Sequence, residues 1–154
     1  MSIVAASRPG SWDFPLFVHV LGAMILVGGL LAAAGALGYA RGDARFLRLG
    51  YWSLLAVSLP GWVVMRGGAE WIRSKEGWND LPEGVSQPSW LDIGSVLADL
   101  GGLILLVSLV AGGVGVRQLR DGKGGGLLRA TLVLSIVLLA AYVVAVWAMA
   151  AKPG

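Results

Sequence analysis

The chain has 154 residues, of which 56% are hydrophobic and 14% charged, and its mean hydropathy is +0.76. Soluble domains carry about 25% charged residues, so this composition excludes an ordinary water-soluble domain. The absence of cysteine excludes disulfides, thiolate metal sites and cysteine catalysis. The formal net charge of +3 comes from short basic clusters between apolar runs, a pattern that indicates membrane topology and not a nucleic-acid surface.

Four apolar runs are long enough to cross a bilayer, which requires about 20 residues. Lipid offers no hydrogen-bond partners, so each run must satisfy its own backbone and is predicted to be a helix. Helices are expected at about 14–40, 49–74, 90–117 and 128–151, with an ordered loop at 75–89. The chain is therefore predicted to be all-α, a single membrane domain over residues 1–154 that forms an antiparallel bundle of four transmembrane helices.

The first predicted helix carries the only histidine of the chain, His19, near its start. Steps of three and four residues place His19 on one stripe with Gly22, Leu26 and Gly29. Small residues let helices approach closely in lipid. We therefore expect His19 to face the bundle and not the acyl chains.

The second predicted helix carries Arg66 near its outer end, one turn after Trp62. Glu70 follows four residues later, a spacing at which the two charges can pair on a helix. Pro60 lies inside the same helix and lacks a backbone N–H. A kink or local opening is therefore expected there.

The third helix carries Asp99, about 10 Å below its predicted outer start at 1.5 Å per residue. Because successive helices alternate in direction, His19, Arg66 and Asp99 should fall in the same half of the bundle. The predicted ligand-pocket residues are His19, Trp62, Arg66, Asp99 and, on the fourth helix, Tyr142. An alternative stays open, in which Arg66 and Asp99 neutralise each other and lock two helices while His19 donates to a backbone carbonyl.

The charges of the loops predict the orientation. Residues 41–48 contain three arginines and one aspartate, and residues 117–129 contain four basic residues and one aspartate, whereas the middle connection is mixed. The positive-inside rule places the two short basic loops in the cytoplasm. We expect a protein of the bacterial inner membrane, with both termini and the 75–89 loop on the outer side.

The residues allow several cofactors without selecting one. His19 could supply one axial ligand of haem b, with Met65 or Met149 as the second. Copper(I) favours imidazole and thioether ligands, which the same three residues offer. No set of nucleophile, base and orienting group is visible, so the sequence does not decide whether the protein is an enzyme.

Four segments in order, "FVHVLGAMILVGGLLAA", "SLPGWVVMRGGAEWI", "SWLDIGSVLADLGGL" and "AAYVVAVWAMAAKPG", resemble a bacterial family of predicted four-helix integral membrane proteins known only as a domain of unknown function. This resemblance covers nearly the whole chain and implies an architecture and a location. More distantly, "HVLGAMILVGG" is similar to the first helix of the copper-resistance protein D and membrane protoporphyrinogen oxidase families. In the latter family a first-helix histidine is linked to haem, and His19 is the matching position.

Three functions are consistent with these observations. The first is binding of a ligand or cofactor, haem or copper, in an outward-facing polar pocket. The second is a small transporter or proton-conducting protein that uses Asp99 with His19. The third is a structural or assembly subunit, within a membrane complex or a homo-oligomer, because glycine and alanine faces suit contact between helices in lipid. In each case the lipid bilayer is a partner and nucleic acid is not.

Overall fold

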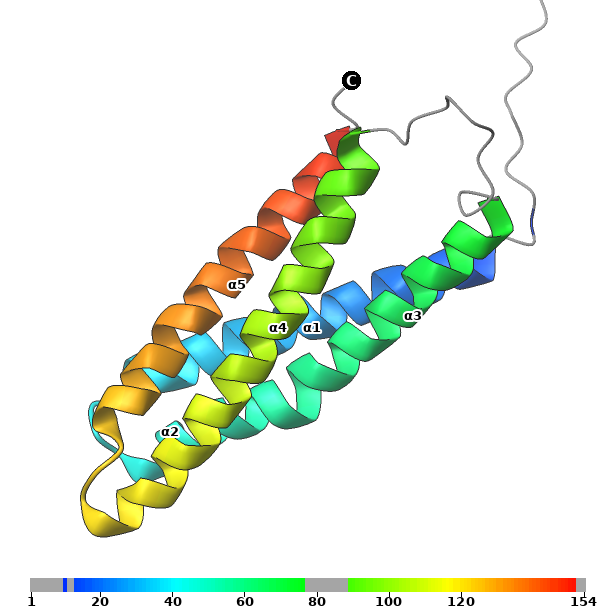
Figure 1. Ribbon diagram of the computed structural model, residues 1–154. Coiled ribbons are helices and arrows are strands. Elements are labelled where there is room, and N and C mark those ends of the chain that lie inside the picture. The colour runs from blue at the N-terminus through cyan, green and yellow to red at the C-terminus, as the bar shows by residue number, and fades with distance from the viewer. Residues whose placement is uncertain (1–9, 11–12, 77–88, 152–154) are drawn as a thin grey trace, which may run out of the picture.

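The computed structural model describes residues 10, 13–76 and 89–151, and it confirms the predicted all-α fold of four long antiparallel helices. The first span is α1 (Asp13–Tyr39) and the last two are α4 (Ser89–Gln118) and α5 (Gly125–Ala151). The second span is continuous over α2 (Ala44–Ser53), η2 (Leu54–Ser58) and α3 (Leu59–Glu76). All four are long and apolar enough to cross a membrane, which makes the chain an integral membrane protein (Figure 1).

Some helices extend beyond the residues expected from hydropathy. The second span begins at Ala44 and not near residue 49, because Asp43 caps it by accepting a hydrogen bond from the Arg45 backbone N–H at 2.8 Å. The last helix begins at Gly125, directly after a turn in which Gly122 and Gly124 have positive φ, a conformation that glycine adopts without steric cost. Of the predicted 75–89 loop, residues 77–88 lie outside the described residues.

The second span opens locally just before Pro60. Residues Leu54–Ser58 form one turn of π-helix, in which the N–H of Leu59 reaches the carbonyl of Leu54. The Ser58 hydroxyl donates to the carbonyl of Ser53 at 3.3 Å. Single π-turns accommodate an extra residue within an α-helix, and the proline cannot donate to the carbonyl of Ala56. The irregularity therefore lies beside the residue from which the sequence predicted an opening.

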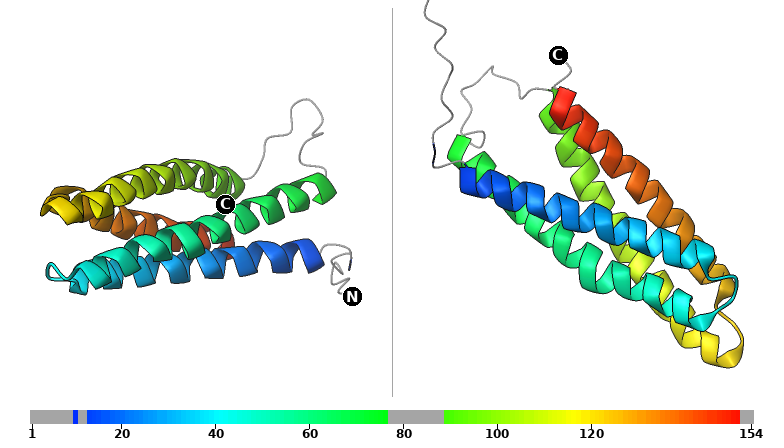
Figure 2. Two further views of the ribbon diagram at one scale, coloured as in Figure 1. Left: turned by 90° about the horizontal axis from the view of Figure 1, so that it is seen from below. Right: turned by 180° about the vertical axis from the view of Figure 1, so that it is seen from behind.

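The helices are arranged as two pairs that diverge. In one pair α1 runs beside α3, and in the other α4 runs beside α5 (Figure 1). The pairs meet at the end that carries residues 40–43 and 119–124, which we call the closed end. They separate toward the other end, where α1 and α4 begin and α3 and α5 finish, which we call the open end (Figure 2). The bundle is therefore V-shaped and not a closed cylinder.

The α1–α3 pair is held at backbone contact by glycines from both helices. A Cβ built on Gly61 would lie 2.5 Å from the backbone nitrogen of Leu26, and one on Gly68 would lie 2.6 Å from that of His19. Gly22 and Gly29 of α1 approach the second span in the same way. We call this contact the α1–α3 seam. The small-residue stripe predicted on the first helix is the face that packs against α3.

Leucines that are fully buried fill the space where the two pairs meet. They come from every span, and the set consists of Leu26, Leu30, Leu54, Leu105 and Leu138. The buried hydroxyls of Ser108, Thr131 and Ser135 each donate to a carbonyl four residues earlier in their own helix. Such bonds satisfy a polar side chain without a partner from another helix. The centre of the bundle is therefore apolar, and the charged residues lie elsewhere.

Candidate functional site

Arg66 joins α3 to α4 through its guanidinium group. Its Nε atom lies 3.0 Å from Oδ1 of Asp99, and its Nη1 atom lies 2.6 Å from Oε1 of Glu70. The side chain of Arg66 is 25% exposed, that of Asp99 59% and that of Glu70 49%. The carboxylates thus neutralise a partly buried cation, while each carboxylate keeps an open side.

Trp62 makes a second contact between the same two helices, one turn from Arg66. Its indole Nε1 donates to the backbone carbonyl of Ala98 at 3.0 Å. The ring lies so close to Gly102 that any Cβ at that position would overlap it. We call the Arg66–Asp99 ion pair and the Trp62–Ala98 hydrogen bond together the α3–α4 clasp. The clasp holds together two helix pairs that separate toward the open end.

The clasp lies far from the closed end, measured along the helices. Asp99 is about 27 Å along α4 from Arg117, and Arg66 is about 33 Å along the second span from Ala44, at 1.5 Å per residue. The hydrocarbon core is about 30 Å thick. If the closed end lies at one interface, we therefore expect the clasp to lie toward the opposite side of the bilayer. Charged side chains cost far less near an interface than at the bilayer centre.

The side chain of His19 forms a hydrogen bond with the backbone of α3. Its Nδ1 atom lies 2.8 Å from the backbone carbonyl oxygen of Met65, and its backbone packs against Gly68. A carbonyl can only accept, so Nδ1 carries the proton and a neutral ring keeps its lone pair on Nε2. This bond fixes the orientation of the imidazole. It also makes His19 part of the α1–α3 seam, whereas Asp99 belongs to the clasp.

Tyr142 reaches α4 from α5. Its side chain is only 4% exposed, and its ring end lies against Gly101, next to the glycine that receives Trp62. Among the described residues its hydroxyl has no hydrogen-bond partner. Trp62 has one N–H, which Ala98 already accepts. Tyr142 therefore brings a buried, unpaired hydroxyl beside the clasp.

The predicted metal donors lie on three helices, and only His19 and Met65 are in contact, through the Met65 backbone carbonyl. Met65 is 6% exposed and belongs to the leucine core, and Met149 covers Gly94 within the α4–α5 pair. His19 lies in the α1–α3 seam. Within the part of the chain that the structure describes, three or more His, Asp or Glu side chains do not gather as metal ligands would. A haem or copper site that uses His19, Met65 and Met149 therefore stays a prediction.

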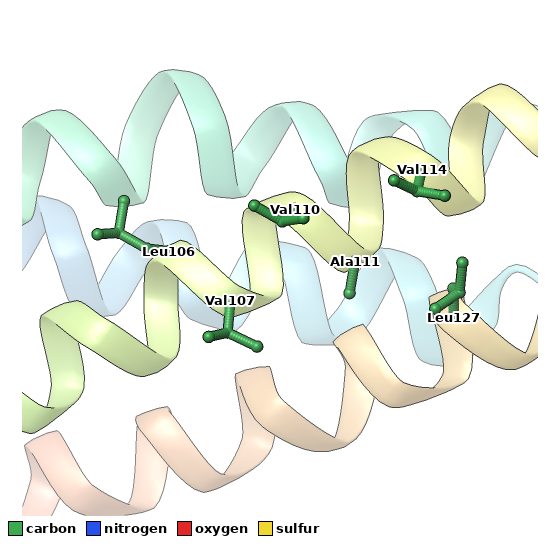
Figure 3. Close-up of a pocket in the computed structure, with 6 residues that line it drawn as sticks. All are labelled: Leu106, Val107, Val110, Ala111, Val114 and Leu127. Carbon is green, nitrogen blue, oxygen red and sulfur yellow. The ribbon is translucent and has the colours of Figure 1, made fainter.

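Two open, apolar grooves lie along α4, away from the residues predicted to form a pocket. One of about 460 Å³ is lined by Leu106, Val107, Val110, Ala111, Val114 and Leu127 (Figure 3). The other, of about 450 Å³, is lined by Asp92, Ile93, Val96, Leu97 and Val144. None of the predicted site residues lines either groove. A polar pocket around His19, Arg66 and Asp99 therefore stays a prediction.

Sequence reasoning named Arg66, Asp99, Trp62 and His19, but not the backbone carbonyls that Trp62 and His19 contact. The carbonyls of Ala98 and Met65 carry no sequence signal as acceptors, because every residue has one. Gly101 and Gly102 did carry a signal, since two glycines within an apolar helix indicate close contact. That pattern does not say which aromatic ring fills the space.

Comparison of the chain with protein-family models, with curated proteins and with solved structures gives no match. The function is therefore inferred from the geometry of the helices and of their polar contacts.

Proposed function

We propose that the protein is an assembly subunit, an integral membrane protein whose α1 presents a small-residue face to another membrane helix. Gly28 and Gly35 carry the proposal. Both are exposed, and among the described residues a Cβ at either position would meet nothing within 4 Å. Gly22 and Gly29 of the same helix have an evident use in the α1–α3 seam. The two exposed glycines have none within the part of the chain that the structure describes.

Helix geometry puts the exposed small residues on one side of α1. Gly28, Ala32 and Gly35 are separated by four and three residues, and all three are exposed. We call them the α1 outer face. Glycine within a helix costs about 0.5 to 1 kcal/mol relative to alanine, and lipid chains gain nothing from its small size. A second helix does gain, because small-xxx-small faces allow backbones to approach within packing distance.

The polar contacts of the bundle favour the same proposal over chemistry. Arg66 and Asp99 bind each other, and the His19 ring is bonded to a carbonyl. These are contacts that hold helices together. The transport alternative requires Asp99 to work with His19, and nothing among the described residues links those two side chains. It stays a prediction, which liposome flux with Asp99→Asn would test.

Cross-linking in native membranes tests the proposal, because the chain has no cysteine of its own. With Ala32→Cys in the full chain, oxidation should join two copies, or join this chain to a different membrane protein. Val133→Cys is the control, since Val133 is 55% exposed on α5 and belongs to no small-residue face. Gly28→Ile with Gly35→Ile should abolish the product. If Ala32→Cys gives no more cross-linked product than Val133→Cys, the proposal is wrong.

A second candidate is binding of haem b, with His19 as the axial ligand. One observation favours it: a histidine that binds a metal usually donates its other ring N–H to a carbonyl or carboxylate, and His19 has this bond to Met65. The resemblance of the first helix to the membrane protoporphyrinogen oxidase family agrees with it. Copper is less well supported, because Met149 packs on Gly94 in the other helix pair.

An absorption spectrum decides the haem candidate. Protein purified with supplemented haem should show a Soret band that His19→Ala removes. Met149→Leu, which changes no residue of the α1–α3 seam, is the matched control and should keep the band. A wild-type spectrum without a Soret band would eliminate this candidate and leave the α1 outer face unaffected.

We also infer that the closed end faces the cytoplasm of a bacterial inner membrane. The support is the excess of arginine and lysine at that end, where both short loops lie. A cysteine placed at Lys123 should be labelled by an impermeant maleimide only after the cells are opened. Labelling in intact cells would show that the closed end faces the outer side of the membrane instead.

A further inference from the structure

The larger groove on α4 runs toward a cluster of basic residues at the closed end. Its wall extends from Leu106 to Val114, about 12 Å along the helix at 1.5 Å per residue, and Leu127 at the start of α5 closes one side (Figure 3). All its lining side chains are apolar, and Val110 is 69% exposed. The groove is therefore shallow and apolar, and it runs along the helix in the direction of the surrounding lipid chains.

Arg117 continues the line of this groove. It follows Val114 by three residues, so the two side chains are neighbours on the same face of α4. Arg120 and Lys123 come next, in the connection to α5. All three cations are exposed, and none of them forms an ion pair in the described part of the chain. Asp121 is the one carboxylate of this connection.

We propose that this groove binds one anionic phospholipid of the surrounding bilayer. One acyl chain lies along Leu106–Val114, and the phosphate lies among Arg117, Arg120 and Lys123. An apolar groove alone would accept the acyl chain of any lipid. The three basic side chains make a lipid with an anionic head group the preferred one. Basic clusters beside transmembrane helices bind anionic head groups. The site lies on α4 and does not involve the α1 outer face, so it is independent of the assembly proposal.

Native mass spectrometry of the full chain from mixed micelles measures the preference directly. With equal amounts of phosphatidylglycerol and phosphatidylcholine, the wild type should retain one phosphatidylglycerol. Arg117→Gln with Lys123→Gln should lower that preference roughly tenfold or more, since each basic residue near a lipid head group contributes about a fivefold effect. Arg45→Gln with Arg48→Gln is the matched control, because it removes the same charge from α2 at the same end of the protein.

Substitutions that fill the groove distinguish binding of the lipid's acyl chain from general attraction of anionic lipids to the basic residues. Val110→Trp places a large ring on the exposed wall and touches no core residue, and Ala111→Phe fills the groove from its floor. Both should lower lipid retention severalfold, whereas Val133→Trp on α5 should not. The proposal is overturned if both pairs of charge substitutions reduce the preference equally, or if neither does. It is also overturned if both groove-filled variants keep phosphatidylglycerol as the wild type does.

Discussion

The α1–α3 seam and the α3–α4 clasp join helices by different means. In the seam, glycines bring two backbones into direct contact, as at Gly68 against His19. In the clasp, long side chains bridge the helices, as Arg66 does to Asp99 at 3.0 Å. Lipid is as apolar as leucine, so burial of apolar side chains gives helices little reason to associate. Close packing and polar bonds remain, and close packing dominates the seam whereas polar bonds dominate the clasp.

The two boundaries should respond differently to substitution. Packing between backbones has no room to adjust, because neither helix can move a side chain aside. A bridge of exposed side chains can rearrange and is weakened by water and salt. We therefore expect the seam to dominate the stability of the protein, and the clasp to set how the α4–α5 pair is held against the first pair.

The largest effect is expected for Gly68→Ala. The added Cβ would lie 2.6 Å from the backbone nitrogen of His19, so the helices must separate, at a cost of about 1 to 3 kcal/mol or more in the free energy of unfolding. The neighbouring Gly67→Ala is the control. In the described part of the chain a Cβ at that position would meet no neighbouring helix within 4 Å, so alanine should be neutral or stabilise the helix by about 0.5 to 1 kcal/mol. Unfolding by SDS in mixed micelles measures both, and equal effects would contradict the seam.

The sequence predicts the two boundaries to different extents, because one is formed by charged side chains and the other by close packing of backbones. Alternating helix direction placed Arg66 and Asp99 at the same level, and the spacing of four residues paired Arg66 with Glu70. Charge and direction are readable from sequence, so the side chains of the clasp could be anticipated. The divergence of the two helix pairs and the choice of the Met65 carbonyl by His19 follow from packing in three dimensions. No residue pattern specifies them.

The next largest effect is expected for Trp62→Phe. Phenylalanine stays aromatic but is smaller than the indole and cannot donate to the carbonyl of Ala98. One hydrogen bond contributes about 0.5 to 1.5 kcal/mol to stability, and the same measurement should report a loss of that size. Trp71→Phe is the control, because Trp71 is 43% exposed and its ring packs on Phe14 in a T-shaped arrangement. If both substitutions have the same effect, the hydrogen bond to Ala98 does not contribute to the free energy of unfolding.

A smaller effect is expected for the ion pair of the clasp. A double-mutant cycle with Arg66→Ala and Asp99→Ala should give a coupling of about 0.2 to 1 kcal/mol, the range of exposed pairs, because the Asp99 side chain is 59% exposed. Salt should reduce it further. Removal of one partner from a fully buried pair costs about 3 to 5 kcal/mol. A loss of that size for either single variant would place the clasp deeper in the bilayer than its distance from the closed end indicates.

The smallest effect, and the one of opposite sign, is expected for Tyr142→Phe. The hydroxyl is buried and has no partner among the described residues, and a buried polar group without a hydrogen bond costs about 1 to 3 kcal/mol. Its removal should leave stability unchanged or raise it by about 1 kcal/mol. Tyr39→Phe, at a residue that is 68% exposed, is the neutral control. A clear loss of stability would mean that the hydroxyl is bonded in the membrane. If that loss disappeared in an Asp99→Ala background, the bond would be to Asp99, and the clasp would then join three helices and not two.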